Sequence, residues 1–571
     1  MAQTISHDRP EAVFQGASRQ RLRRLANMGW MGTHLVFCIM LVMPIAMIIA
    51  LAFGFQQESV DIDLMVHLAS TVLSHYLLTT IELMIGVGLV AILLGVSAAW
   101  VISRYDFPGR GVLEWALMLP AAMPAYLIAY AYTDFLEYSG PLQSGLRQIF
   151  GWQTARDYWF FEVRSLPVAA ILMGAVLYPY IYLFARTAFR LTSTQLFEVA
   201  AISGQHIFWQ VGLPLARPAI FAGLALVLME VMSDFGTVDY FAIETITLGI
   251  FNVWLGNNDL AAAAQLSLFA FVLIGSIAGL EIYARSRRSF RTHAFQRTGV
   301  PRLAPSFGGQ LACLSLCLLP LTLGFIMPVG ILVQFLLQGV TLDWSDEFLP
   351  LLGETLGLAF SGAILVMMGA VLMALNNTYR LPMRAKLVTS VGLAGYAFPG
   401  TILAIGVLGF VGLLDQIWMN LTGQILLGGS LGVLMLGYLV RFQAVGYGSV
   451  SSGLKRMPPF MMDASRSLGR GFLGSLWKVI LPLLRNSILA GLLIVFVDVM
   501  KELPLTLLLR PFGIETFATF TYQYAKEEQI ELAALPALSI VLAGLVPVII
   551  ANRALRDRRH TQPTNRHGLS E

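Results

Sequence analysis

Charged residues are scarce in this sequence: Asp, Glu, Lys and Arg together make up 12% of its 571 residues. Soluble globular proteins carry about 25%, and a chain with half that amount could not cover the surfaces of several soluble domains. Hydrophobic residues instead reach 57%. This composition excludes disorder and a string of soluble domains, and it predicts an all-α polytopic membrane protein with many spanning helices.

Cysteine and histidine are also few, which argues against a disulfide framework and a resident metal. All three cysteines, Cys38, Cys313 and Cys317, lie in apolar runs. Cys313 and Cys317 are one helical turn apart, a spacing that favours small packing residues over half a metal site. The eight histidines include no pair at close helical spacing, although His67, His75 and Tyr76 share one outer segment and could touch a cation. We predict no metal site on this chain.

Lysine is rare too, with five in the whole chain, and none follows a glycine. A phosphate-cradling loop of the P-loop type ends in Gly-Lys, so the chain carries no ATPase motif of this kind. The sequence contains no nucleophile constellation either, and we predict no catalytic residue. The arginines flank apolar runs, as orientation signals do, which argues against a nucleic-acid partner.

About twelve apolar runs are long enough to cross a bilayer as helices of about 20 residues. They centre near residues 42, 90, 124, 177, 225, 272, 322, 364, 399, 433, 494 and 542. The first run, from about Trp30 to Phe55, is longer than a signal-peptide core and has no obvious cleavage site, so we interpret it as a retained span. An even number of spans predicts that both termini lie on the same side of the membrane.

Basic residues predict which side that is, because cytoplasmic loops are enriched in Lys and Arg. With both termini in the cytoplasm, 31 of the 37 Lys and Arg fall on cytoplasmic segments. The six others are Arg147, Arg156, Arg164, Lys501, Arg510 and Lys526. The stretch 285–302 has six arginines and no acid, and we interpret it as part of a cytoplasmic linker.

Two similar halves flank this linker. The segment Leu213–Arg217 aligns with Leu481–Arg485 at an offset of 268 residues, and the order of matches is kept while the offset drifts to 275 at Pro124 and Pro399. Each half has six spans, so the halves share one orientation. Parallel repeats of this kind typically enclose a translocation path.

The repeat and the charge pattern together predict five segments. They are a cytoplasmic N-terminal segment at 1–28, a first repeat at 29–284, a basic cytoplasmic linker at 285–308, a second repeat at 309–552 and a basic cytoplasmic tail at 553–571.

Each half carries a similar cytoplasmic loop after its fourth span. The first reads Glu-Val-Ala-Ala-Ile-Ser-Gly at 198–204, and the second reads Asp-Ala-Ser-Arg-Ser-Leu-Gly at 463–469. Each pattern predicts a short helix that ends at a left-handed glycine, followed by a proline in the first turn of the next spanning helix. Small residues in the middle would let a partner approach closely, although an ordinary helical loop is the alternative.

The pattern Glu-Ala-Ala, three residues, Gly and then Leu-Pro resembles the cytoplasmic loop of binding-protein-dependent ABC importer permeases of type I. In that family the loop contains a coupling helix, which sits in a groove of the ATPase subunit. The resemblance implies coupling roles for Glu198, Ala200, Ala201, Gly204, Pro214, Asp463, Ala464, Gly469 and Pro482. This chain differs from the pattern at Val199, which stands for the first Ala, and at Asp463 and Ser465, which stand for Glu and the second Ala.

Within this family the likeness is closest to fused, two-half permeases of ferric-iron importers, on the stretches 233–240, 498–504 and 507–512. It implies two copies of an ABC ATPase that use ATP and Mg²⁺, a periplasmic or lipid-anchored substrate-binding protein, and a location in the lipid of the bacterial inner membrane. No cofactor is expected on this chain. Fused thiamine and phosphonate permeases share the architecture, and an ion-gradient-driven secondary transporter is the alternative of another class.

Four acidic residues lie within or beside two matched spans, where an ionisable side chain is costly and suggests a function. Glu230 matches Asp498, and Asp234 matches Glu502. The resemblance associates this region with the path and its outer gate, so we predict these four as path or gate residues suited to a cation. The alternative is that they mark helix ends or pair with bases such as Lys501.

Overall fold

The computed structural model of the chain describes residues 10–55, 66, 70–192, 194–286, 302–338, 344–380, 385–458 and 460–560. Over these ranges the chain is helical, with one isolated bridge between Tyr105 and Leu303 and no strand. The prediction of an all-α membrane protein is confirmed. His67 lies outside the described residues, as do parts of the predicted segments 1–28, 285–308 and 553–571.

Among the described residues, eleven helices are long and apolar enough to cross a bilayer, and one bent pair brings the number to twelve. The eleven run over Gly29–Ala52, Leu73–Arg104, Leu166–Leu191, Phe208–Ser233, Leu260–Ile277, Phe307–Leu337, Asp346–Tyr379, Gly400–Thr422, Leu431–Lys455, Phe472–Met500 and Ile530–Ile550. The bent pair, Arg110–Ala122 and Ala125–Phe150, turns by 91°. The predicted number of about twelve spans agrees with this result.

The third span of each half is where the predicted positions are wrong. The run centred near residue 124 is not one helix, because Pro124 keeps an extended backbone (ψ 142°) between two helical segments. In the second half Pro399 has the same conformation (ψ 146°), and α17 (Gly400–Thr422) begins after it instead of being centred on it. A proline disfavours helix at the preceding residue and has no N–H for a helix, so each run breaks there.

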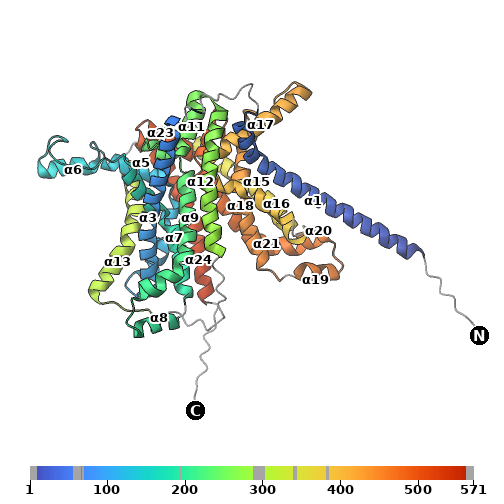
Figure 1. Cartoon of the computed structure of the whole chain (residues 1–571), viewed down its shortest axis with the longest axis horizontal. Helices are drawn as coiled ribbons and strands as arrows, with labels where there is room; N and C mark the ends of the chain where they lie inside the picture. The colour runs from blue at the N-terminus through green and yellow to red at the C-terminus, as the bar shows by residue number, and fades with distance from the viewer. Residues whose placement is uncertain are drawn as a thin grey trace, which may run out of the picture.

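The two halves repeat one another element by element (Figure 1). The matched pairs are α3 (Leu73–Arg104) and α15 (Leu349–Tyr379), α7 (Leu166–Leu191) and α18 (Leu431–Lys455), α9 (Leu213–Ser233) and α21 (Leu481–Met500), α10 (Gly236–Tyr240) and α22 (Pro504–Leu509), α11 (Ile246–Asn257) and α23 (Phe517–Lys526), and α12 (Leu260–Ser286) and α24 (Ile530–His560). One hydrogen bond recurs: the Ile246 amide donates to Thr80, and the Phe517 amide donates to Thr355, both at 2.9 Å. The internal repeat therefore extends to individual contacts.

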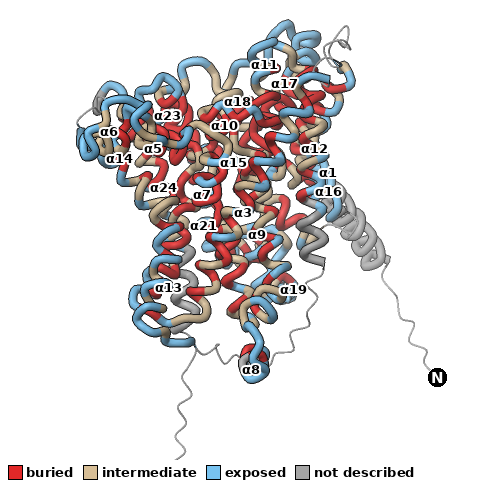
Figure 2. The backbone as a smooth tube through the Cα atoms, turned by 60° about the vertical axis from the view of Figure 1, so that its left-hand side comes forward, coloured by how far each residue is buried: buried red, intermediate tan, exposed pale blue. Residues whose placement is uncertain are grey.

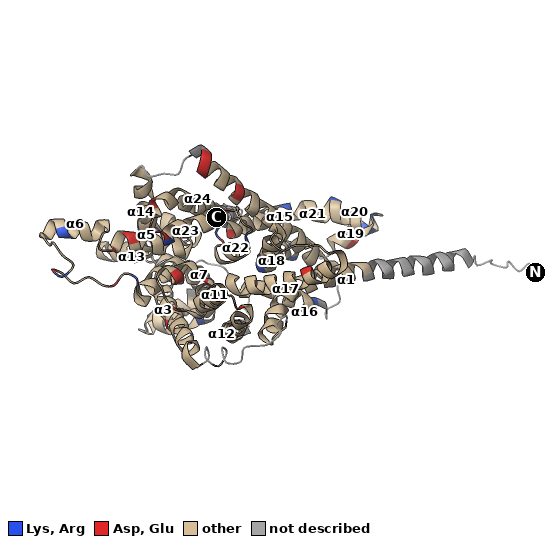
Figure 3. Cartoon of the chain, turned by 90° about the horizontal axis from the view of Figure 1, so that it is seen from above, with Lys and Arg blue, Asp and Glu red and all other residues tan. Residues whose placement is uncertain are grey.

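Buried residues form a continuous core between these helices (Figure 2). Helices α3 and α7 approach closely at Gly95, where a Cβ would lie 2.9 Å from the backbone oxygen of Tyr178. Only glycine allows such a contact. Seen along the bundle, charged residues are few on the helices (Figure 3), so those that lie inside the core are candidates for function.

The first helix of each half packs on the other half. Helix α1 (Pro10–Ala52) lies against α17, where Gly406 leaves space for the Pro44 carbonyl. In return, the helical segment Phe307–Leu337 (α13, a π-turn and α14) lies against the first half. There the hydroxyl of Tyr132, on α5 (Ala125–Leu136), donates to the Leu323 carbonyl at 2.9 Å. The halves are thus interlocked rather than merely adjacent.

The two loops with the Glu-Ala-Ala-like pattern lie at the same end of the molecule. Their helices, α8 (Thr194–Ile202) and α19 (Met461–Ser467), lie at the end where α24 leads to the C-terminus, whereas α11 and α23 lie at the other end (Figures 1 and 2). We call these ends the loop face and the opposite face.

Candidate functional site

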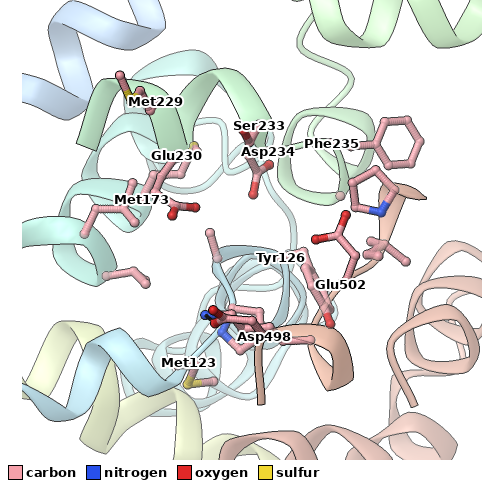
Figure 4. A pocket seen from close by; sticks show the side chains of 18 of the residues that line it. Met123, Tyr126, Met173, Met229, Glu230, Ser233, Asp234, Phe235, Asp498 and Glu502 are labelled. Carbon is pink, nitrogen blue, oxygen red and sulfur yellow. Dashed lines mark ion pairs between the residues drawn. The ribbon is translucent and has the colours of Figure 1, made fainter. Parts of the chain in front are cut away.

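A cavity of about 140 Å³ lies between the two halves. Residues of α7, α9 and α10 line it from the first half, and residues of α18, α21 and α22 line it from the second. All four acids predicted for the path are among its lining residues: Glu230, Asp234, Asp498 and Glu502. Figure 4 shows these side chains gathered around one space.

The two acids of the second half are held in ion pairs. The Arg441 guanidinium lies 3.0 Å from Glu502 and also donates to the Phe398 carbonyl at 2.9 Å. The Lys501 ammonium lies 2.9 Å from Asp498. Both bases line the cavity as well, so each of these carboxylates has its own counter-charge in place.

The two acids of the first half have neutral partners instead. Glu230 accepts a long hydrogen bond of 3.5 Å from the Tyr180 hydroxyl. Asp234 accepts from the amide and the hydroxyl of Thr237, at 2.9 and 3.0 Å. Within the described part of the chain, no ion pair reaches Glu230 or Asp234. The sequence repeat matches the four acids in pairs, but the structure gives the pairs different surroundings.

Helix ends set the position of these acids. Helix α9 ends at Ser233, and Asp234 caps the short helix α10 that follows. In the second half Glu502 caps α22 in the same way, by accepting from the Leu505 amide at 3.3 Å. Capping by a carboxylate satisfies amides that the first turn of a helix leaves free. Asp234 and Glu502 therefore mark helix ends, which is the alternative that the sequence left open, while their role in a path stays a prediction.

Several lining residues escaped prediction from the sequence. Arg441 lies inside the span Leu431–Lys455, so the positive-inside count, which assigns it to the cytoplasm, is wrong for this residue. The rule that singles out Glu230, an ionisable residue within a span, would have found it. Tyr126 and Tyr180 carry no such signal, since aromatic residues are common in spans. Tyr126 is 5% exposed, and its hydroxyl has no hydrogen-bond partner in the described structure.

Both loops on the loop face form a short helix that ends as predicted. Gly204 (φ 65°) follows α8, and Gly469 (φ 84°) follows α19. In the first loop the Gln205 amide donates to the Ala200 carbonyl at 3.0 Å, and in the second the Arg470 amide donates to the Ser465 carbonyl at 3.3 Å. These are the six-to-one bonds of a Schellman motif, so the two helices end with the same geometry.

The spanning helices after these loops begin earlier than predicted, at Phe208 and Phe472, six and ten residues before Pro214 and Pro482. Pro214 and Pro482 lie in the first turns of the segments α9 and α21, which continue these spans. A single π-turn precedes each helix, over Phe208–Gly212 in the first half and Leu476–Ile480 in the second. The repeat therefore covers the whole connection from the loop helix to the span.

The loop helices combine a buried anchor with an exposed surface. On α8, Phe197 is buried against Trp100 of α3, with ring centroids 6.2 Å apart, while Glu198 and Ile202 are exposed. On α19, Met462 is buried while Asp463 and Ala464 are exposed. Ala200 is buried rather than exposed, and the side chain of Ala201 lies outside the described residues.

Apolar side chains are exposed around both loop helices. Val199 and Ile202 are exposed on α8, as are Phe460 and Leu468 beside α19, whereas the exposed Trp209 and Trp477 lie at the starts of the spans that follow. An apolar surface beyond the membrane spans is typical of a protein-binding site. The loop face therefore offers two surfaces for partner subunits, related by the internal repeat.

A small basic recess lies beside α19. Arg380 and Arg466 line it together with Asp463, and the Arg380 guanidinium lies 3.8 Å above the ring of Phe472. Burial and then the nearby charge of Arg466 lower the pKa of Arg380, because both disfavour a further positive charge. The recess therefore presents two arginines, Arg380 and Arg466, beside Asp463, the acidic residue of the second loop helix.

The histidine and cysteine positions singled out from the sequence lie, where the structure describes them, apart from the central cavity between the halves. His75 pairs with Glu244 at 3.2 Å and is exposed, and Cys313 and Cys317 are buried. Within the described ranges, no group of three or more histidine, cysteine or acidic side chains is close enough to hold a metal ion.

No family model matches the chain. The chain is 23% identical over 489 residues to an Fe(3+)-transport system permease protein of Haemophilus influenzae, a match that covers 84% of this chain and 90% of that relative. It is 24% identical over 189 residues to a molybdenum transport system permease protein of the same organism, covering 32% of this chain and 79% of the relative. A protein of Salmonella typhimurium, named as a candidate 2-aminoethylphosphonate transport system permease, is 24% identical over 222 residues, covering 38% of this chain and 77% of the relative.

The lengths of these matches agree with the internal repeat. The iron-transport relative matches across both halves. The two others match about a third of this chain over more than three quarters of their own length, which fits relatives that hold one copy of the repeat.

Proposed function

We propose that this chain, a homologue of the permease subunits of ABC transport systems, is the fused permease of a binding-protein-dependent importer that carries ferric iron across the bacterial inner membrane. Such permeases are not enzymes themselves, and in this proposal a separate ATPase supplies the energy. The relative that matches both halves is an iron-transport permease, which supports both the fused architecture and the substrate.

The charge of the central cavity is the observation that favours ferric iron as the substrate. Its lining includes four acids and two bases, so the excess is negative. A surplus of carboxylates favours passage of a cation and disfavours oxyanions such as phosphonate or molybdate. Ferric iron fits this preference because it is small, highly charged and bound best by oxygen ligands.

Coupling to ATP would pass through the loop face, with one ATPase copy on each loop. The exposed apolar residues around α8 and α19 suit a protein partner, and the anchors Phe197 and Met462 are buried in the bundle. A rigid-body movement of an ATPase subunit would therefore be passed to the spans through a firm connection. In this orientation the termini are cytoplasmic.

The substrate-binding protein would dock on the opposite face, which is closed by contacts between the halves. The Tyr522 hydroxyl donates to Asp239 at 2.6 Å, and the Lys526 ammonium lies 3.1 Å from the same carboxylate. Arg164 pairs with Glu528 across the halves at 3.5 Å. In an alternating-access cycle these contacts would open when ATP closes the ATPase dimer, and the cation would then enter the cavity.

Reconstituted transport tests this proposal against a secondary transporter. The complex of this chain with its ATPase is placed in vesicles that enclose ATP and Mg²⁺, and the binding protein and ferric iron are supplied outside. We expect uptake to require ATP and to survive an ionophore that collapses the proton gradient. Uptake without ATP, driven by a proton gradient, would support the secondary transporter instead.

The same vesicles separate the possible substrates. Thiamine and a phosphonate are offered in place of iron, each with the binding protein that the system uses. ATP-dependent uptake of either one, with no uptake of iron, would keep the importer class and reject the iron assignment.

A further inference from the structure

We propose that the cation-binding site of the path is built by the first half alone, from Glu230 and Asp234 with the hydroxyls of Tyr126 and Tyr180. In this arrangement the second-half acids serve as permanently neutralised ion pairs. The inference rests on the proposed function and adds to it which residues receive the cation. It begins from the unequal surroundings of acids that the repeat makes equivalent.

The two bases of the cavity have no counterparts in the first half. The matched glycines Gly223 and Gly491 meet Ile181 of α7 and Ser449 of α18, and this register matches Arg441 to Met173. The offset that matches Leu213 to Leu481 also matches Lys501 to Ser233. Met173 and Ser233 both line the same cavity, so the first-half acids have neutral residues at the two positions where their partners meet a base.

The geometry of the first-half acids suits shared binding of one ion. Glu230 and Asp234 are four residues apart at the end of α9, which puts them on the same side of the helix, one turn from each other. Figure 4 shows both side chains beside the cavity. Ser233, which lies between them in the sequence, lines the cavity too. A cation there would gain two carboxylates. Neither is in an ion pair, although Lys501 and Arg441 lie within electrostatic reach of Glu230.

An independent observation also points to a ligand. The Tyr126 hydroxyl is buried and lacks a partner in the described structure, although the residue lines the cavity. A buried hydroxyl without a hydrogen bond is costly. A cation in the cavity, or the water that accompanies it, would satisfy this oxygen, and Tyr180 adds a second hydroxyl beside Glu230.

A site with these ligands suits a cation in transit rather than a permanently bound one. A path must attract its ion and then release it. Two carboxylates and two neutral hydroxyls fill only part of an octahedral shell, which leaves the remaining positions to water. Within the described residues no larger ligand group is present at the cavity. The ion pairs of Arg441 and Lys501 would further limit the attraction, because they keep positive charge nearby.

The first test introduces into the first half a base that corresponds to Lys501 of the second half. Ser233→Lys puts an ammonium three residues after Glu230, as Lys501 follows Asp498, and Ser233→Ala is the matched control. In the reconstituted complex we expect Ser233→Lys to lower the iron transported per ATP about tenfold or more, because a fixed cation beside the site competes with the substrate. Ser233→Ala adds no charge to the cavity and should lower this ratio much less than Ser233→Lys.

A second variant tests the carboxylates directly. Glu230→Gln with Asp234→Asn keeps the side-chain shapes and leaves an oxygen to cap α10, so a fall in iron per ATP reports lost charge. Asp498→Asn with Lys501→Met removes an acid and a base together and should lower the ratio much less. Equal losses from the two double variants, or Ser233→Lys with unchanged transport, would overturn the inference.

These outcomes are distinct from a failure of the proposed function. If the unchanged complex moves no ferric iron under ATP, the proposed function fails whatever the variants do. If it moves iron and the first-half variants move it equally well at normal ATP turnover, only the assignment of the site to the first half is wrong.

Discussion

Glu114 is a buried carboxylate that three arginines share. It lies on α4 (Arg110–Ala116), contacts Arg186, and lies 3.0 Å from Arg190 and 3.6 Å from Arg110. Its own exposure is 7%. The cluster ties α4 to the end of α7, directly before the loop helix α8, and so holds the base of the first half together.

Removing this carboxylate should therefore destabilise the protein strongly. Glu114→Gln leaves the arginines without their shared counter-charge, and breaking a buried ion pair from one side costs about 3–5 kcal/mol. We expect a clear fall in the thermal unfolding temperature of the purified protein. Glu162→Gln, which changes an exposed acid, is the control, and equal unfolding temperatures for the two variants would show that the cluster contributes little.

The residues of the cavity show what the sequence can and cannot predict about the site. Glu230 and Asp498 are recognisable because each is an acid within a span and the two match in the repeat. The pairing of Asp498 with Lys501, three residues away, is an alternative that the sequence offers. The pairing of Glu502 is not recognisable, because Arg441 comes from a distant helix and reaches Glu502 only in the folded chain. Tyr126 was beyond prediction for a different reason, since only burial reveals that its hydroxyl lacks a partner.

At the scale of elements, the loop helices depend on their terminal glycines. Gly469 has φ 84°, whereas Gly471, two residues later, has φ −68°. A side chain at a left-handed position costs about 1–2 kcal/mol, and Gly471 lacks this constraint. We expect Gly469→Ala to lower ATP-driven uptake with normal amounts of protein in the membrane, and Gly471→Ala to have little effect.

Uptake and membrane abundance measured together decide this prediction. A loss of uptake that tracks a loss of protein would indicate a folding defect instead. Equal uptake in the two variants would argue that the end of α19 does not contribute to coupling.

The contact between α1 and α17 gives a second prediction at this scale. A Cβ at Gly406 would overlap the Pro44 carbonyl, whereas a Cβ at Gly412 on the same helix would have no atom within 4 Å of it. Overpacking of a tight contact costs about 1–3 kcal/mol. Gly406→Val should therefore lower the unfolding temperature, and Gly412→Val should change it much less. Similar values would contradict a tight contact between these two helices.

At the scale of the whole molecule, the hydropathy of the sequence was enough to predict the helical class and the number of spans. It could not predict the break at Pro124, because hydropathy measures how apolar a run is and not whether it stays straight. Nor could it predict that α1 packs on the opposite half, since both halves offer apolar helix faces and only close contacts such as Gly406 with Pro44 select one.

The interlocked halves predict that the chain can be divided. If it is cut between residues 287 and 301 and the two pieces are expressed together, we expect them to co-purify and to retain uptake, because contacts such as Tyr132 with Leu323 do not need a continuous chain. Each piece expressed alone should be unstable, since its first helix would lack the half on which it packs. Stable, separately purified halves would contradict this arrangement.

Iron uptake by whole cells tests the central claim most directly. A strain that lacks this chain is restored with the unchanged protein or with the double variant Glu198→Arg, Asp463→Arg, and radiolabelled ferric iron is supplied under iron limitation. We predict that uptake falls without the chain, returns with the unchanged protein, and stays low with the double variant at equal membrane abundance. Uptake that does not fall on removal, or that the double variant restores in full, would contradict the account.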